Sequence, residues 1–191
     1  MKKVAIFLAL LSAAVFAQGT LTDKRDGKKY KTVKIGEQVW MAKNLEYKAN
    51  KKGKHGGLYN WETAMKACPA GWHLPSDNEW QTLINSTGDS EFAGRQLKTK
   101  SGWDKKSNGT DKYGFSALPG GSAGESTAFG KTGCDGGCWW SATVATEDGI
   151  DDAAYARQIN YDRSEDESEG LSADRFYEVK KAMFSVRCIK D

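Results

Sequence analysis

The fold of this chain is decided by Cys68-Pro69-Ala70-Gly71-Trp72-His73-Leu74-Pro75-Ser76-Asp77-Asn78-Glu79-Trp80. Ser76 and Glu79 have the spacing of a capping box, in which each side chain bonds to the backbone amide of the other residue. Pro75 stops any helix that approaches from upstream. The pattern predicts a short helix that starts after Ser76 and ends by Gly88. Its apolar residues are three and four positions apart, on one face: Trp80, Leu83 and Ile84.

A second short helix is expected just upstream of this stretch. Asn60 can cap it, and Pro69-Ala70-Gly71 closes it. The two helices then meet at a turn that carries Cys68 and Trp72. A third, weaker helix is predicted over Glu91–Thr99.

The first seventeen residues have the pattern of a secretory signal peptide. Lys2 and Lys3 form the charged start, Val4–Phe16 is apolar, and a small-residue cleavage site precedes Gln18. No later stretch approaches the ~20 apolar residues that a membrane span needs. We therefore expect an exported protein, secreted, periplasmic or at the cell surface, with no membrane span.

Charge is distributed unevenly along the chain. Residues 22–66 carry twelve Lys or Arg against five Asp or Glu, whereas residues 144–178 carry eleven Asp or Glu against three Arg. We interpret these segments as two solvated faces of opposite sign. A nucleic-acid-binding protein would combine a basic stripe with a recognition motif, and this chain has no such motif. We therefore expect no nucleic-acid partner.

Four cysteines in an exported chain favour two disulfides. Three pairings can be drawn for four cysteines. Cys134 and Cys138 enclose only Asp-Gly-Gly, which is flexible enough for a local bridge, and that pairing leaves Cys68 with Cys188. A zinc site that uses all four cysteines is the rival, but the spacing lacks paired C-x-x-C knuckles.

Alternating residues predict short strands at both ends of the chain. Tyr30–Ile35 and Gln38–Met41 would form a hairpin around Gly36-Glu37. Later strands are expected at Trp139–Thr143, Ala153–Tyr161 and Phe184–Ile189, the last with Phe184, Val186 and Cys188 on one face. Between these groups, Ser101–Gly137 reads as a long loop region or as short strands with long connections.

These elements predict one α+β domain over residues 29–191, preceded by an arm at residues 18–28. The domain would have small antiparallel sheets, two or three short helices and a long loop region. A Cys68–Cys188 bridge would join a helix to the closing strand. This layout resembles that of C-type-lectin-like domains.

Several motifs along the chain resemble the Fibrobacter succinogenes major paralogous domain family. They are Arg25-Asp26-Gly27 before Tyr30, Val33-x-Ile35-Gly36-x-Gln38-x-Trp40-Met41-Ala42-x-Asn44-Leu45, Tyr59-Asn60-Trp61, Cys68-Pro69-x-Gly71-Trp72-His73-Leu74-Pro75-Ser76, Tyr113-Gly114-Phe115-Ser116-Ala117-Leu118-Pro119-Gly120-Gly121, Trp140-Ser141-Ala142-Thr143 and Ser185-Val186-Arg187-Cys188. Met183 departs from the pattern, which usually has glycine there. The resemblance implies an exported or surface protein of a fibre-degrading bacterium, with the C-type-lectin-like fold of formylglycine-generating enzymes. The family has no settled activity to carry over.

No residue pattern points firmly to catalysis. His73, between Trp72 and Leu74, is interpreted as a partly buried hydrogen-bonding residue, and His55 as a solvated loop residue. No Gly-x-Ser-x-Gly elbow supports a catalytic triad. A free Cys134/Cys138 pair with copper, as in formylglycine-generating enzymes, and a carboxylate pair of a glycoside hydrolase remain the enzymatic alternatives.

No cofactor is assigned from the sequence. Calcium is the alternative, because carboxylates gather between Glu147 and Glu169 and could supply oxygen ligands. Their spacing fits no EF-hand, and the Glu-Pro-Asn and Trp-Asn-Asp signatures of calcium-dependent lectins are missing. The residues concerned are Asp148, Asp151, Asp152, Asp162, Glu165, Asp166 and Glu167.

The favoured function is therefore that of a non-catalytic binding or surface-adhesion module for a glycan or plant polysaccharide; a surface protein is the other partner considered. A structural cell-surface or filament component is the alternative. In C-type-lectin-like domains the long loops and adjoining strands form the usual binding surface, here Ser101–Tyr161. An exposed aromatic platform with polar neighbours is expected there, because sugars present apolar C–H faces and hydroxyl rims. The candidates are Trp103, Trp139, Tyr155 and Tyr161, with Asn108, Asp111, Asp135 and Arg157.

Overall fold

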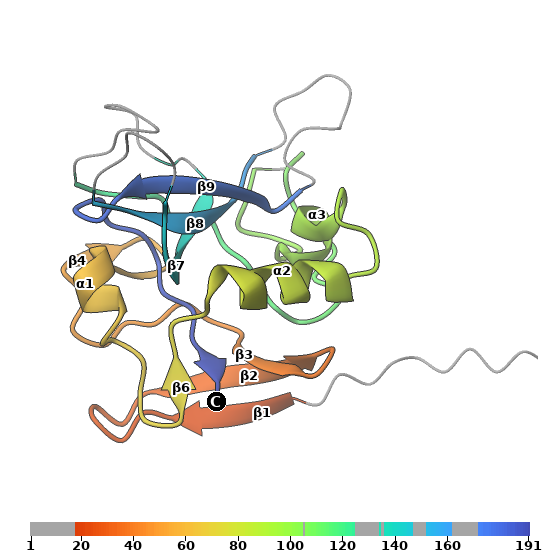
Figure 1. Cartoon of the computed structure of the whole chain (residues 1–191). Helices are drawn as coiled ribbons and strands as arrows, with labels where there is room; N and C mark the ends of the chain where they lie inside the picture. Colours follow the sequence, from red (N-terminus) through yellow and green to blue (C-terminus); the bar gives the residue numbers. More distant parts are fainter. Residues whose placement is uncertain (1–17, 105, 125–133, 135, 147–151, 162–171) are drawn as a thin grey trace, which may run out of the picture.

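The computed structural model describes residues 18–104, 106–124, 134, 136–146, 152–161 and 172–191. The expected signal peptide lies outside the described residues. Within the described part, three helices and three antiparallel sheets confirm the α+β class (Figure 1). None of these helices has the length and apolarity that a membrane span requires.

The largest sheet has five strands in the order β1-β2-β3-β10-β6 and forms one side of the molecule (Figure 1). The predicted hairpin is confirmed, and Gly36 takes a φ of 57° at its turn, a conformation that favours glycine. The expected arm is wrong in its first part, because Gln18–Thr22 pairs with β2 along its whole length. This strand is almost entirely exposed, so it carries no apolar alternation that would reveal it. The strands are β1 Gln18–Thr22, β2 Lys29–Ile35, β3 Gln38–Met41, β6 Trp72–His73 and β10 Ile189–Lys190.

All three predicted helices are present: α2 has the predicted bounds, whereas α1 and α3 are shorter than expected. In α1 (Trp61–Ala64), the Asn60 side chain caps the amide of Thr63. In α2 (Asp77–Ser86), the Ser76 and Glu79 capping box is complete. Helix α2 buries Trp80, Leu83 and Ile84, as predicted, and α3 covers Ala93–Leu97.

A three-stranded sheet, β7-β8-β9, lies on the other side of α2 from the large sheet (Figure 1). Strands β7 (Gly137–Val144) and β8 (Ala153–Ile159) confirm the predictions there. Strand β9 (Asp174–Val179) was not predicted, because it follows an acidic segment and its sequence is mostly charged and aromatic. A two-stranded hairpin, β4 (Lys51–Gly53) and β5 (Gly56–Leu58), occupies a segment for which the sequence predicts no strand.

Two hydrophobic clusters pack on opposite faces of β7. Trp140 belongs to one cluster and Trp139 to the other, and both rings are completely buried. The closing strand is shorter than expected, since only Ile189–Lys190 joins the large sheet. The predicted common face is confirmed, because Phe184, Val186 and Cys188 all lie in the Trp140 cluster.

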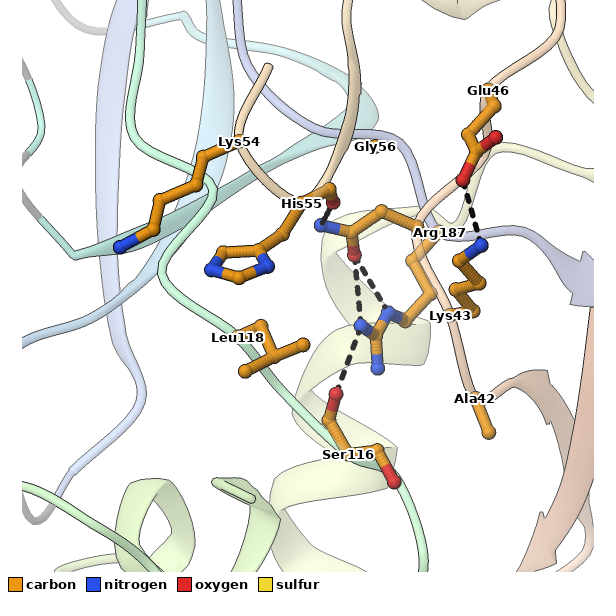
Figure 2. A pocket seen from close by; sticks show the side chains of 10 residues that line it. Ala42, Lys43, Glu46, Lys54, His55, Gly56, Ser116, Leu118 and Arg187 are labelled. Carbon is orange, nitrogen blue, oxygen red and sulfur yellow. Dashed lines mark hydrogen bonds and ion pairs between the residues drawn. The ribbon is translucent and has the colours of Figure 1, made fainter. Parts of the chain in front are cut away.

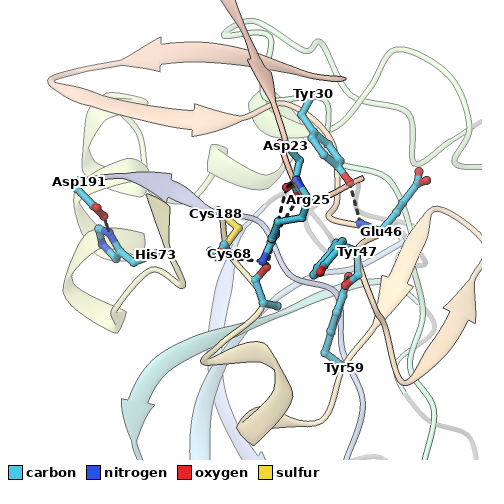
Figure 3. Close-up of a disulfide and its surroundings, with 11 residues drawn as sticks. Asp23, Arg25, Tyr30, Glu46, Tyr47, Tyr59, Cys68, His73, Cys188 and Asp191 are labelled. Atoms are coloured by element: carbon cyan, nitrogen blue, oxygen red, sulfur yellow. Dashed lines mark hydrogen bonds and ion pairs between the residues drawn. A yellow bond between two sulfur atoms is a disulfide. The ribbon is translucent and has the colours of Figure 1, made fainter. Parts of the chain in front are cut away.

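Two disulfides join Cys68 to Cys188 and Cys134 to Cys138, the pairing favoured by the sequence. The long bridge ties the turn between α1 and β6 to the end of the chain (Figure 3). Beside it, Arg25 pairs with the buried Asp23 at 2.7 Å and donates to the carbonyl oxygens of Ala67 and Cys68. The long bridge therefore holds the region after α1 against the segment before β10, and Arg25 holds it against the segment between β1 and β2.

Candidate functional site

A cavity of about 250 Å3 opens between three segments that are far apart in sequence (Figure 2). They are the loop after β3, the tip of the β4–β5 hairpin and the loop that contains Ser116 and Leu118. Arg187, just before β10, completes the lining. The polar lining residues used below are Lys43, Asn44, Lys54, His55, Ser116 and Arg187.

The buried Asn44 amide connects the walls of this cavity. Its Oδ1 accepts hydrogen bonds from Trp139 Nε1 at 2.8 Å and from Arg187 Nη2 at 2.8 Å and Nε at 3.1 Å. Its Nδ2 donates to the His55 carbonyl at 2.8 Å and to Ser185 Oγ at 3.2 Å. Because both ends of the amide are bonded, its orientation is fixed, and so is the position of the hairpin tip.

Arg187 brings a buried positive charge to the cavity. Among the described residues, the guanidinium bonds to the Asn44 amide oxygen and to the carbonyl oxygens of Phe115 and Ser116, and to no carboxylate. Burial lowers the pKa of Arg187 to about 9, while the more distant Asp111 acts in the opposite direction. The side chain is therefore still protonated at neutral pH. Its hydrogen-bond partners are neutral, and the Phe115 ring centre lies 4.3 Å from the guanidinium carbon, so a positive potential remains around it.

His55 is the lining residue whose environment differs most from the sequence prediction. It was expected to be solvated, but it is half-buried, and its Nε2 is buried without a hydrogen-bond partner. Burial, and then the charge of Lys54, lower the pKa of this imidazole. A neutral ring with an unused polar atom therefore lines the cavity (Figure 2).

A glycine is required where the hairpin tip meets the Asn44 loop. Gly56 has a φ of 114°, and a Cβ atom there would lie 2.6 Å from the Cβ of Asn44. No side chain fits in that space. The close backbone approach lets the preceding His55 reach the cavity wall.

A second, basic cavity of about 490 Å3 adjoins the first and shares Glu46, Lys54 and Gly56 with it. Lys28, Lys48 and Lys52 add positive charge to its lining. Glu46 pairs with Lys43 at 2.7 Å and with Lys28 at 2.9 Å, and these contacts lower the pKa of its carboxyl. Together the two cavities form a basic surface, and the one carboxylate among the described residues that line it is paired with two lysines.

The structure places the sequence-predicted ligand residues elsewhere, in two groups. Trp103, Asn108 and Tyr161 lie together: the Trp103 ring meets Tyr161 edge-on at 5.2 Å, and the Trp103 amide donates to Asn108 Oδ1. Trp103 is only 7% exposed, and its Nε1 bonds to the Ala117 carbonyl. Asp111 stabilises its own loop by accepting from the amide and hydroxyl of Ser116. Asp135 lies outside the described residues.

The second group lies on β7 and β8. Trp139 is 0% exposed and is hydrogen-bonded to Asn44. Arg157 is also buried and pairs with Asp77 of α2 at 2.5 Å. Tyr155 is half-buried beneath the Arg175 guanidinium, 4.7 Å from its ring centre. The expected exposed platform of Trp103 and Trp139 is therefore wrong, because β7 and the long loop have apolar core on the sides where solvent was assumed.

No catalytic or metal constellation emerges from the described part of the chain. His73 is half-buried and contacts Asp191 Oδ1 at 2.6 Å (Figure 3). It also contacts Glu79 Oε1 at 2.8 Å, as the hydrogen-bonding interpretation predicts. All four cysteines are in disulfides. The described residues contain no group of three His, Cys, Asp or Glu that could hold a metal ion. Most of the carboxylates considered for calcium lie outside the described residues, so calcium stays a prediction.

Motif residues from the beginning, middle and end of the chain meet at the first cavity, namely Asn44, Ser116, Leu118 and Arg187. His55 lies between motifs, so only its position close to Asn44 in sequence could have indicated it.

No curated protein and no solved structure matches the chain. The family model described as the Fibrobacter succinogenes major domain matches residues 47–190, which is most of the chain. The chain therefore belongs to the Fibrobacter succinogenes major domain family.

Proposed function

We propose that this protein is an exported, non-catalytic binding or surface-adhesion module that holds a glycan at the Arg187 cavity. The observation that carries the proposal is the buried Nε2 of His55, which has no hydrogen-bond partner although His55 lines a cavity where Asn44 and Arg187 are fixed by hydrogen bonds. A binding site needs a few preorganised polar groups and a concave surface. Export is supported by the two disulfides, since such bonds persist in oxidising compartments.

The lining suits a sugar better than a purely apolar ligand. Lys54 and His55 offer polar groups for hydroxyls, and Leu118 adds an apolar surface beside them. Sugars combine the two kinds of surface on one ring. The fold supplies these groups from loops held by Asn44, so little ordering is required when a ligand binds.

The same lining argues against hydrolysis of the bound sugar. Most glycoside hydrolases place two carboxyl groups on either side of the scissile bond. Among the described residues, Glu46 is the one carboxylate that lines either cavity, and two lysines pair with it. A lining with this one paired carboxylate supports binding of a sugar without its hydrolysis.

A glycan and plant-polysaccharide array, probed with and without calcium, tests the proposal. The wild-type protein should give reproducible hits, and His55→Ala should lose them while it unfolds at the same denaturant concentration. Tyr177→Ala is the matched control, since that ring is 39% exposed on β9, away from the cavity lining. An array without hits under both conditions would contradict the proposal and favour a structural role at the cell surface or in a filament.

A further inference from the structure

The two adjoining cavities share an excess of positive charge that the proposed function does not use. Glu46 is the one carboxylate among the described residues that line them. Six cationic side chains line the same two cavities: Lys28, Lys43, Lys48, Lys52, Lys54 and Arg187.

We propose that the ligand is an anionic polysaccharide, with a sugar carboxylate in the Arg187 cavity and the neighbouring sugars along the lysine-lined cavity. This assignment rests on the proposed function and specifies its ligand. The first cavity, at about 250 Å3, is below the range of roughly 300–1,000 Å3 typical of small-molecule sites, so it suits one sugar unit. The adjoining space, at about 490 Å3, allows the chain to continue.

Two features of the first cavity favour a carboxylate over a neutral group. Lys54 lines both cavities, so its ammonium can pair with an anion at their junction. The unpartnered His55 Nε2 can donate a hydrogen bond in the tautomer that carries its proton there. Arg187 acts through its field, because its nitrogens already bond to Asn44, Phe115 and Ser116. Because Arg187 is buried, its field is screened weakly by water.

The same lining disfavours nucleic acid, the other common polyanion. Proteins that hold single-stranded nucleic acid stack its bases on aromatic side chains. In the described part of the chain, neither cavity is lined by Phe, Tyr or Trp. A positively charged lining without aromatic rings for base stacking fits an acidic polysaccharide better than a nucleic acid.

The test compares two forms of one polymer on the full chain with both disulfides intact. Calorimetric titration with polygalacturonate should give binding, and the same polymer with its carboxylates methyl-esterified should bind at least about tenfold more weakly. The double variant Lys52→Gln/Lys54→Gln should lose about tenfold in affinity for the acid form, as expected for two exposed charge pairs. Lys66→Gln/Lys100→Gln removes the same charge from exposed positions outside both cavities and should change the affinity less than about twofold.

Each other outcome overturns a different claim. Equal binding of the acid and ester forms, or equal losses in the two double variants, overturns the anionic assignment and leaves glycan binding in place. Single-stranded DNA that binds as tightly as polygalacturonate, with the same loss in Lys52→Gln/Lys54→Gln, overturns the assignment to a saccharide. A failure of both polymers, together with an array that shows no hits, contradicts the proposed function itself.

Discussion

At the scale of single residues, Asn44 links the fold to the candidate site. Its amide holds Trp139, Arg187 and Ser185 on one side and the His55 backbone on the other. No local sequence signal predicts this role, because three of the four residues that Asn44 bonds to are at least 95 positions away in the chain. The sequence can mark Asn44 as part of a motif, and only the folded chain shows what it bonds to.

Asn44→Ala should lower the free energy of unfolding by roughly 2–5 kcal/mol, because it leaves several buried donors without an acceptor. Chemical denaturation, followed by tryptophan fluorescence, measures the change. Asn78→Ala, at an exposed position on α2, is the control and should stay within about 0.5 kcal/mol of wild type. A similar small change for Asn44→Ala would show that its hydrogen bonds are not structural.

His73 should make stability depend on pH. Burial lowers the pKa of His73, but the hydrogen bonds with Asp191 and Glu79 outweigh it, so the pKa lies above its ordinary value. A raised pKa in the folded state stabilises the protein below the unfolded pKa of about 6.5, and this contribution disappears as the pH rises through the folded pKa. His73→Gln should therefore cost more stability at pH 5.5 than at pH 9. Equal costs at the two pH values would contradict this linkage.

At the scale of elements, capping and turn signals predict individual elements well, and strand pairings between distant segments poorly. The capping box of α2 and the β2–β3 hairpin are encoded within a few residues of sequence, and both are confirmed. Strands β1 and β9 are not predicted from local signals, because each is stabilised by pairing with a neighbouring strand. The prediction of an exposed Trp139 is wrong for a different reason, because alternation along a strand does not reveal that both of its faces are buried.

The two disulfides should contribute unequally to stability. Cys68 and Cys188 are 120 positions apart, whereas Cys134 and Cys138 are four apart. In the loop-entropy model the long bridge stabilises by about 5 kcal/mol and the short one by about 2 kcal/mol. Cys68→Ala/Cys188→Ala should therefore unfold at a much lower denaturant concentration than Cys134→Ala/Cys138→Ala. Non-reducing peptide mapping of each variant confirms that the remaining bridge is native. The reverse order of stability would contradict the loop-entropy prediction.

At the scale of the whole molecule, the candidate site exists only after the ends and the middle of the chain come together. The α+β class and the family could be derived from the sequence, since they depend on local patterns and motifs. The cavity could not, because its walls come from the Asn44 loop, the β4–β5 hairpin, the Ser116 loop and Arg187. Long-range bonds, and not the aromatic content of the long loop, position its polar groups.

The central claim, that ligand binding occurs at the Arg187 cavity, is tested most directly by NMR. Trigalacturonate titrated into 15N-labelled protein should shift the amide signals of Lys54, His55, Gly56 and Ser116, which belong to the cavity walls. The amides of Tyr155 and Tyr177, on β8 and β9, should stay unchanged. Shifts confined to β8 and β9, or no shifts at saturating ligand, would contradict the account.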